Sequence, residues 1–238
     1  MTIANDSLTS SQFENDLLAA VMQHSMLKHP FYVAWSEGKL TREVLQEYAK
    51  QYYAHVRAFP TYVSAVHSHC DDLEIRQLLL ENLIEEEQGS ENHPELWLRF
   101  AESLGVTRDE VRNAELLPAT TDSVARLKEL TQRSDYREGL AALYAYESQI
   151  PEVAKTKRAG LREFYGIDDE RGVSFFRVHE SIDILHQDVE KQTLAKQCLT
   201  SLEQSKTISV AQEAAKVLWH FLDGVFDAYY RPSRPLVA

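Results

Sequence analysis

Two histidines and an aspartate in the last third of the chain have a spacing that could bind a metal ion. His179, Asp183 and His186 occupy positions i, i+4 and i+7. On an α-helix, which turns by about 100° per residue, their side chains fall within about 60° of one another. Two imidazoles with one carboxylate form the donor set of non-haem iron that reacts with O₂. The spacing predicts that one ion could meet all three residues, and the alternative is a set of polar residues on a helix surface.

Further donors occur upstream. Glu86 and His93 are seven residues apart, so they share one face if their helix remains continuous through Gly89. Of the three consecutive glutamates at 85–87, the middle one is in phase with this histidine. Glu147 lies within an apolar stretch, where an unpaired carboxylate would cost several kcal/mol. The alternatives are a solvated acidic face for Glu86 and an ion pair with a basic residue for Glu147.

Three carboxylates and three imidazoles could together hold two metal ions. A carboxylate that bridges two ions about 3.5–4 Å apart would account for all six donors. Mixed oxygen and nitrogen donors favour iron or manganese, whereas structural zinc more often recruits thiolates. The chain lacks the Glu-x-x-His pairs of the familiar di-iron bundles, so the geometry would be a different one. The six candidates are Glu86, His93, Glu147, His179, Asp183 and His186.

Other polar and aromatic groups have simpler explanations. The segment His67-Ser68-His69-Cys70-Asp71-Asp72 resembles a metal site in composition, but it closes a helix, where His and Asp are common. We therefore interpret it as structural. Five tyrosines are expected to be core residues whose hydroxyls reach polar partners. They are Tyr48, Tyr52, Tyr62, Tyr144 and Tyr146.

The composition is that of an ordinary globular protein. The chain has 238 residues, of which 44% are apolar and 26% are charged, and its formal net charge is −12. The negative charge argues against nucleic acids and anionic membranes as partners. No apolar run approaches the ~20 residues of a membrane span, and the first residues lack the pattern of a secretory signal. The two cysteines, Cys70 and Cys198, are too few for a disulfide framework, which favours a reducing cytoplasm.

Helical periodicity dominates the whole chain. Capping boxes at Ser11-Gln12-Phe13-Glu14 and Thr107-Arg108-Asp109-Glu110 mark two helix starts, and Pro60 should kink or break a long helix. We expect a single all-α domain, a compact bundle of about seven to nine helices, with residues 1–9 and 231–238 flexible. The expected helices cover roughly residues 11–22, 41–69, 72–88, 96–105, 122–132, 135–149, 151–165, 171–186 extending or re-forming toward 199, and 209–229.

Longer motifs connect these residues to a known family. Over roughly residues 20 to 225, the chain resembles the chlamydial protein associating with death domains and its bacterial homologues. That family lies within the haem-oxygenase-like superfamily, together with pyrroloquinoline-quinone synthase (PqqC) and the aminopyrimidine-releasing thiaminases (TenA). The motifs that carry the resemblance are Phe31-Tyr32-Val33, Tyr48-Ala49-Lys50, Ala58-Phe59-Pro60, Cys70-Asp71-Asp72-Leu73-Glu74, Asn92-His93, Tyr146-Glu147-Ser148-Gln149-Ile150-Pro151 and His179…Asp183…His186.

The resemblance implies a helical bundle around a di-metal site, Fe/Fe or Fe/Mn, with the six candidate donors in the family's ligand positions. It also implies synthesis of para-aminobenzoate for folate by a self-sacrificing reaction that uses O₂ and an external reductant. In the family, a tyrosine supplies the aromatic ring and a lysine supplies the amino group, and Tyr32 and Lys157 fall on these positions. Without the resemblance, Tyr32 would be read as a core aromatic residue and Lys157 as an exposed helical lysine. A homodimer is usual for the superfamily.

Two other functions remain open at this level. A TenA-like or PqqC-like enzyme would act on a small molecule, and a thiaminase-like hydrolase would need a nucleophile, for which Cys70 is the candidate. A non-catalytic interaction protein would use the six polar residues as buried hydrogen-bonding groups. No motif for binding death domains is recognisable. His69 and the Ser90-Glu91 insertion differ from the family pattern, but neither is at a ligand position.

Overall fold

Helices make up nearly all the regular structure in the computed structural model, which describes residues 7–231 apart from the side chains of residues 182, 184 and 185. The all-α class is confirmed, and the described residues form more and shorter helices than the seven to nine expected. The helices are α1 Ser10–Met22, α2 Pro30–Ser36, α3 Arg42–His69, α4 Leu73–Glu87, α5 His93–Ser103, α6 Arg108–Arg112, α7 Pro118–Thr131, α8 Tyr136–Glu147, α9 Ile150–Tyr165, α10 Glu170–His179, α11 Ile182–Gln197 and α12 Ser201–Val225, with a 3₁₀ turn at Met26–Lys28 and a π-helical turn at Phe226–Tyr230.

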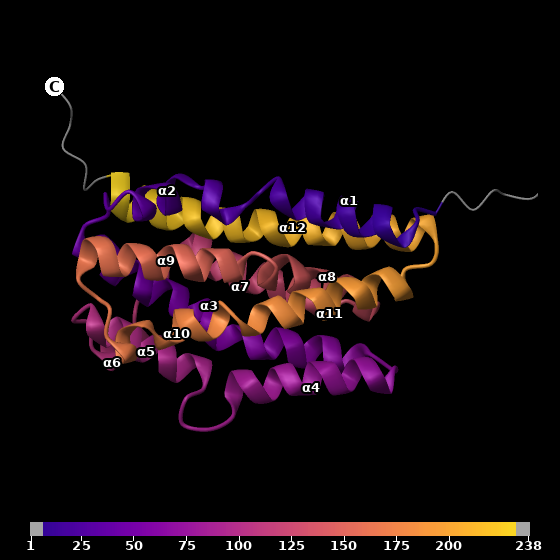
Figure 1. The fold of residues 1–238 in the computed structure, drawn as a ribbon, viewed down its shortest axis with the longest axis horizontal. Helices are drawn as coiled ribbons and strands as arrows, with labels where there is room; N and C mark the ends of the chain where they lie inside the picture. The colour runs from indigo at the N-terminus through magenta and orange to yellow at the C-terminus, as the bar shows by residue number, and fades with distance from the viewer. Residues whose placement is uncertain (1–6, 232–238) are drawn as a thin grey trace, which may run out of the picture.

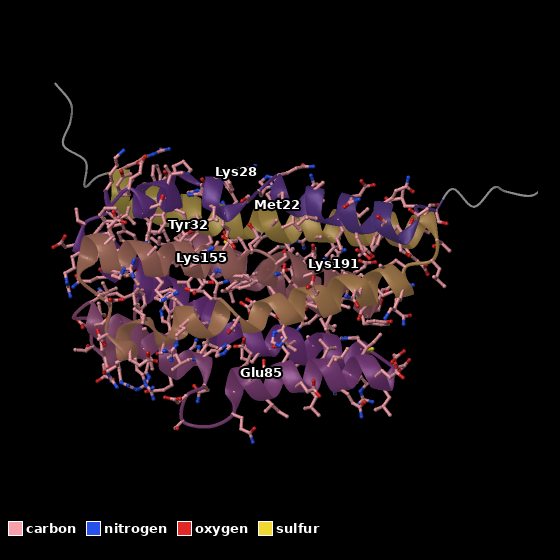
Figure 2. The ribbon with its side chains drawn as sticks, in the orientation of Figure 1. Met22, Lys28, Tyr32, Glu85, Lys155 and Lys191 are labelled. Atoms are coloured by element: carbon pink, nitrogen blue, oxygen red, sulfur yellow. The ribbon has the colours of Figure 1, made fainter. Side chains whose placement is uncertain are left out.

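The helices lie side by side along the long axis of the molecule (Figure 1). One edge is formed by α1, α2 and α12, and the opposite edge by α4, α5 and α6. Between them, α12 packs on α8 and α7, α10 packs on α5 and α9, and α11 packs on α8. Tyr32 of α2 lies where this edge helix meets α9 (Figure 2). The buried apolar side chains of these helices form one cluster, so the polar side chains inside it need an explanation.

The longest helix, α3, runs from Arg42 to His69 without a break, although Pro60 lies inside it. Of the kink or break expected at this proline, the break is therefore wrong: the helix continues through Pro60. Proline inside a helix costs roughly 3 kcal/mol because it removes one hydrogen bond and its ring crowds the preceding turn. Burial of apolar side chains along both halves of α3 offsets this cost.

Several helix starts differ from the sequence prediction. The first capping box joins Thr9 and Gln12, two residues before the expected one at Ser11, and the last long helix begins at Ser201 because Thr200 and Glu203 form a capping box. Leu8 and Thr9, expected to be flexible, instead hold α1: the Leu8 N–H donates to Gln204 Oε1 at 2.8 Å. Residues 1–6 and 232–238 lie outside the described residues.

Three interruptions between helices lie next to candidate metal ligands. Gly89, with φ of +83°, separates α4 from α5 between Glu86 and His93. The α8–α9 junction follows Glu147 directly, and the α10–α11 junction at 180–181 separates His179 from Asp183. The chain thus turns where its candidate donors lie, which lets donors from separate helix ends approach one another.

Within the part of the chain that the structure describes, no helix is both long enough and apolar enough to cross a membrane.

Candidate metal centre

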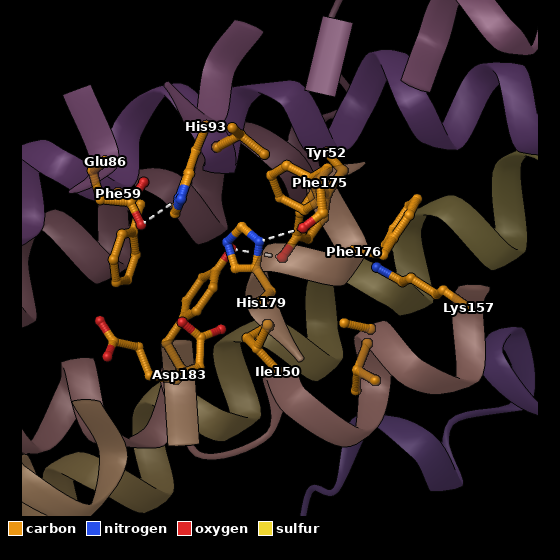
Figure 3. A pocket seen from close by; sticks show the side chains of 15 residues that line it. Tyr52, Phe59, Glu86, His93, Ile150, Lys157, Phe175, Phe176, His179 and Asp183 are labelled. Atoms are coloured by element: carbon orange, nitrogen blue, oxygen red, sulfur yellow. Dashed lines mark hydrogen bonds and ion pairs between the residues drawn. The ribbon is translucent and has the colours of Figure 1, made fainter. Parts of the chain in front are cut away.

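Five of the six candidate donors line one small cavity between the helices (Figure 3). The cavity has a volume of about 30 Å³, which is space for about one water molecule. Its wall combines polar donors with aromatic side chains and Lys157, which lies across the cavity from Glu86 (Figure 3). The donors that line it are Glu86, His93, Glu147, His179 and Asp183.

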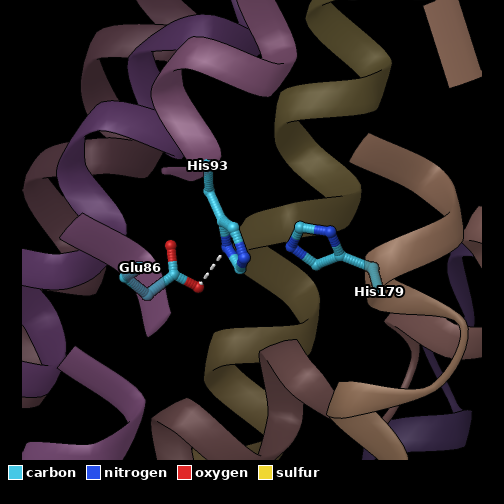
Figure 4. A group of neighbouring side chains, drawn as sticks. All are labelled: Glu86, His93 and His179. Atoms are coloured by element: carbon cyan, nitrogen blue, oxygen red, sulfur yellow. Dashed lines mark ion pairs between the residues drawn. The ribbon is translucent and has the colours of Figure 1, made fainter. Parts of the chain in front are cut away.

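The first group of donors joins three helix ends. Glu86 lies near the end of α4, His93 begins α5 and His179 ends α10, and one donor atom from each lies within 4.8 Å of the others. His93 lies between the other two (Figure 4). Its Nδ1 is 2.8 Å from Glu86 Oε1, and its ring centroid is 4.4 Å from that of His179. We name this set the first triad.

The second group joins α8 and α11. Glu147 ends α8, and Asp183 and His186 lie in the first turns of α11, again with one donor atom each within 4.8 Å of the others. His186 Nδ1 is 3.4 Å from Glu147 Oε2 and 4.0 Å from Asp183 Oδ1. On the other side of the ring, His186 Nε2 is 3.0 Å from the half-exposed Glu85. We name Glu147, Asp183 and His186 the second triad.

The structure corrects two expectations about these helices. His179, Asp183 and His186 do not share one helical stripe, because the helix is interrupted at 180–181, and His179 groups with Glu86 and His93 instead. One ion on a single stripe is therefore the wrong arrangement. The helix that carries Glu86 also ends before Gly89. The turn at this glycine nevertheless brings His93 to within 2.8 Å of the Glu86 carboxylate.

Protein groups orient two of the donors. His179 Nδ1 lies 2.7 Å from the carbonyl oxygen of Phe175, so this nitrogen donates and Nε2 keeps its lone pair for a ligand. The side-chain amide of Asn82 donates to Glu147 Oε1 at 2.9 Å. A backbone carbonyl behind an imidazole and an amide behind a carboxylate are the supports that metal ligands ordinarily have.

Burial shifts the protonation equilibria of the donors. Burial raises the pKa of Glu86, although nearby His93 opposes the shift. Burial and then the charges of Glu147 and Glu86 raise the pKa of Asp183 well above its usual range. Burial and then His93 lower the pKa of His179 well below its usual value, which keeps this ring neutral, as a metal ligand must be.

Several buried donor atoms have no hydrogen-bond partner within the described residues. They include Glu147 Oε2, Asp183 Oδ2 and His93 Nδ1, whose 2.8 Å approach to Glu86 lacks the angle of a hydrogen bond. Such atoms are costly when they are left unpaired. A divalent cation at each triad would satisfy them and offset the crowding of carboxylates, so the residues present fit a pair of metal ions.

A network of tyrosines and one lysine lies beside the cavity. Lys157 Nζ donates to Tyr48 Oη at 2.6 Å, and this hydroxyl is 2.9 Å from Tyr32 Oη. The Tyr52 and Tyr146 hydroxyls are 2.8 Å apart, and the rings of Tyr48 and Tyr52 stack with centroids at 5.5 Å. Tyr52, Tyr146 and Lys157 line the cavity, whereas Tyr32 and Tyr48 lie behind them.

Lys157 is not the exposed helical lysine that the residue pattern alone favours. Only 3% of it is exposed, and its amine lies 4.9 Å from the ring centre of Tyr32 and 4.7 Å from that of Tyr52. Burial lowers the pKa of Lys157 well below its usual range, which favours the neutral, nucleophilic form of the amine. Tyr32 is 1% exposed, as expected for a core aromatic residue.

The segment His67–Asp72 has the structural role expected of it. His67 and His69 lie in the last turn of α3, and Asp72 caps α4 by accepting the N–H groups of Glu74 and Ile75. The Cys70 thiol is buried and points to the Asp72 carbonyl oxygen at 3.6 Å. Burial raises the pKa of this thiol, which disfavours the thiolate that a hydrolytic nucleophile would need.

Sequence reasoning missed one buried acid beside the second triad. Glu190 is 5% exposed, and burial, followed by the charges of Glu147 and Asp183, raises its pKa well above the usual range. The signal that could have found it is its spacing, four residues after His186 and seven after Asp183, which continues the same helical stripe.

Comparisons with known proteins support the resemblance drawn from the sequence. A family model described as "Iron-containing redox enzyme" matches residues 46–220. The chain is 40% identical over 231 residues to the 4-aminobenzoate synthase of Nitrosomonas europaea, covering 93% of this chain and 94% of that protein. It is 46% identical over 207 residues to the 4-aminobenzoate synthase of Chlamydia pneumoniae, covering 87% and 91%. A TenA homologue from Pseudomonas syringae has the same fold, with a TM-score of 0.78 at 14% identity over 91% of this chain and 92% of that one.

Proposed function

The chain belongs to the iron-containing redox enzyme family, and on that premise we propose that it makes 4-aminobenzoate, also called para-aminobenzoate, from its own residues. Tyr32 supplies the aromatic ring and Lys157 supplies the amino group, in a reaction that consumes O₂ and an external reductant. The shared name of relatives at 40–46% identity supports the product. The product serves folate synthesis, and each chain turns over at most once.

The observation that carries the proposal is the position of a neutral amine beside a buried phenol. Lys157 Nζ, Tyr48 Oη and Tyr32 Oη form one hydrogen-bonded chain, and the amine lies 4.9 Å from the centre of the Tyr32 ring. A lysine in an aromatic core lacks an ordinary structural explanation, because its burial costs several kcal/mol, either for an unpaired charge or for the loss of its proton. A role as an amine nucleophile explains why it is there.

The carbon skeleton of the product defines which bonds must change. 4-Aminobenzoate has six ring carbons and one carboxyl carbon, which a tyrosine can supply as its ring and Cβ. The Cα–Cβ bond of Tyr32 must therefore break, Cβ must be oxidised to a carboxylate, and nitrogen must replace the phenol oxygen. The phenol oxygen leaves as water, and Lys157 gives the nitrogen when its Cε–Nζ bond breaks and Cε is oxidised to an aldehyde. Cleavage of the Cα–Cβ bond leaves a glycine residue at position 32. O₂ is the oxidant, and the reductant supplies the remaining electrons.

The two triads are the residues that would hold the metal ions, Glu86, His93 and His179 for one and Glu147, Asp183 and His186 for the other. When bound, two reduced ions, Fe/Fe or Fe/Mn, would supply electrons to O₂ and the oxidising power to attack a phenol. The two imidazoles and one carboxylate of the first triad are the usual donors of oxygen-reactive iron.

Tyr32 does not line the cavity, so oxidation of its ring needs a path for electrons from Tyr32 to the metal centre. The Tyr52–Tyr146 hydroxyl pair lies at the cavity wall, and Tyr48 stacks on Tyr52 while its hydroxyl contacts Tyr32. Each hydroxyl contact lets a proton shift by one bond as an electron leaves the phenol. We propose that electrons leave Tyr32 by this route. Burial of every ring in it keeps out water that would quench an oxidised phenol.

Labelled protein tests the source of the ring. A chain with ¹³C-tyrosine, loaded with iron and manganese without O₂ and then exposed to O₂ and reductant, is expected to release ¹³C-labelled 4-aminobenzoate. Intact mass should fall at the peptide that contains Tyr32. Tyr32→Phe should release less than about one-hundredth of the product, whereas Tyr62→Phe, which alters a buried tyrosine outside the network, should retain it. Labelled product from Tyr32→Phe would move the search to Tyr48 and Tyr146.

A matched pair of lysine variants tests the source of nitrogen. Chains labelled with ¹⁵N-lysine should transfer ¹⁵N to the product. Lys157→Met should abolish that transfer, whereas Lys155→Met should not, because Lys155 lies on the same helix (Figure 2) with its side chain 68% exposed. Unlabelled nitrogen in the product from wild-type chains would assign the amino group to another donor.

A thiaminase-like hydrolase is the less favoured function. Cys70 lies at the end of α3, away from the cavity wall, and its thiol is kept protonated by burial. A purely structural role is also less favoured, because the buried donor atoms described above lack partners.

A further inference from the structure

One buried acid beside the candidate metal centre has no role in the function proposed above. Glu190 lies in α11 with 5% of its surface exposed, and neither of its carboxylate oxygens has a hydrogen-bond partner among the described residues. An unsatisfied buried carboxyl costs several kcal/mol. A side chain placed at this cost requires a partner.

No basic group among the described residues is this partner. Burial and then the charge of Glu190 raise the pKa of Tyr144 to about 12, but no hydrogen bond joins the Tyr144 hydroxyl to either Glu190 oxygen in the described structure. The charged groups that act on it are Glu147 and Asp183, both acidic, and no basic side chain in the described structure offsets them. Three carboxylates therefore face one imidazole, that of His186. The first triad, by contrast, has one carboxylate and two imidazoles. The excess of negative charge is specific to the second triad.

The helix places Glu190 on the stripe that carries two members of that triad. Asp183, His186 and Glu190 follow one another at intervals of three and four residues, so their side chains leave α11 on the same side. Both His186 and Glu190 also line a second cavity of about 300 Å³ between α4 and α11. The Glu190 oxygens are not among the three mutually close donor atoms, but the cavity that Glu190 shares with His186 leaves space beside its side chain.

We propose that Glu190 is a fourth donor to the divalent cation held by Glu147, Asp183 and His186. This inference rests on the metal centre proposed above and extends it. Three carboxylates and one imidazole make an oxygen-rich donor set, which suits a hard cation such as Mn²⁺. The buried carboxylate gains its missing partner, and the cation offsets the repulsion among the three acids.

The test is a titration of metal-free chains with Mn²⁺ alone, without O₂. The electron paramagnetic resonance signal of free Mn²⁺ measures how much of the metal is bound. The wild type should bind two ions per chain. Glu190→Gln keeps the size and the hydrogen-bonding capacity of the side chain. It should lower the affinity for one Mn²⁺ ion roughly 10- to 100-fold and leave the affinity for the other unchanged. Glu190→Asp, which keeps the charge, should weaken the same ion less. Circular dichroism checks that each variant is folded.

Asp188→Asn is the matched control, because it removes a carboxylate that is 54% exposed, on the same helix and paired with Lys191. It should change Mn²⁺ affinity less than twofold. Affinity of Glu190→Gln within twofold of the wild type overturns the inference, as does an equal loss in both variants, which would assign the effect to long-range charge. A wild type that binds neither Mn²⁺ nor Fe²⁺ would contradict the proposed function as well, whereas two tightly bound Mn²⁺ ions in Glu190→Gln would contradict only the role of Glu190.

Discussion

The two triads lie in the same bundle but differ in the balance between carboxylates and imidazoles. In the first, a single carboxylate faces two imidazoles, one of them 2.8 Å away, so no like charges are crowded together. In the second, two carboxylates, with Glu190 beside them, face one imidazole that also contacts the half-exposed Glu85. The first triad is therefore nearly balanced within the protein, whereas the second depends on a cation for charge balance.

The two groups also differ in access. All three residues of the first triad are buried, whereas the His186 side chain is 19% exposed and lines the larger cavity at the surface of α11. A buried, balanced site should bind its ion slowly and hold it firmly. A partly exposed, acidic site should exchange its ion more readily, because a hydrated cation can reach it through neighbouring carboxylates.

The largest expected effect comes from removing one imidazole from each triad. His93→Ala and His186→Ala should each lower bound metal from two ions per chain to one and reduce 4-aminobenzoate at least about 100-fold, because each variant removes one of the three or four protein ligands of its ion. Elemental analysis after loading without O₂ and gel filtration measures the metal. If either variant loses both ions, the triads are one cooperative centre and the contrast drawn above is wrong.

Metal removal should change stability by the next largest amount. At 100 times its Kd, each ion should raise the free energy of unfolding by about 2.7 kcal/mol. Urea unfolding of metal-free and Mn²⁺-loaded chains measures this gain. In Asp183→Asn the gain should fall to that of the first triad alone, and an undiminished gain would show that the second triad holds no ion.

The charge excess predicts a dependence on pH in the metal-free protein. Because the pKa of Asp183 is raised by folding, its folded form binds more protons than its unfolded form, and stability falls as pH rises from about 4 through the raised pKa. Asp183→Asn should therefore be more stable than the wild type by about 1–3 kcal/mol at pH 8. The difference should shrink toward pH 4 in urea titrations with a chelator present. A difference independent of pH would contradict the charge explanation.

The smallest effect is expected at the edge of the second triad. Glu85 is half exposed and pairs with His186 at 3.0 Å, so Glu85→Gln should change stability by less than about 1 kcal/mol. It should slow Mn²⁺ entry at low ionic strength without changing the number of ions bound, as measured by stopped-flow mixing. Loss of an ion in this variant would make Glu85 a ligand rather than a surface partner.

Much of the fold was predictable because its signals are local. Helical periodicity from residue 41 and the capping box at Thr107 predict where α3 and α6 begin, and the structure confirms both. The identity of the six candidate donors also came from the sequence, through spacing, an acid in an apolar stretch and family resemblance. These signals depend on residue type and helical repeat, which neighbouring residues fix without reference to the rest of the fold.

Tertiary structure decided how those donors are grouped. The interruption at 180–181 contains no glycine or proline from which it could be predicted. Because of it, His179 lies in one triad and Asp183 in the other. Packing between distant helices likewise buried Lys157 among tyrosines and left Glu190 beside two other acids. Periodicity fixes only the direction in which a side chain leaves its own helix. Which groups it then meets, and at what electrostatic cost, depends on helices far away in the sequence.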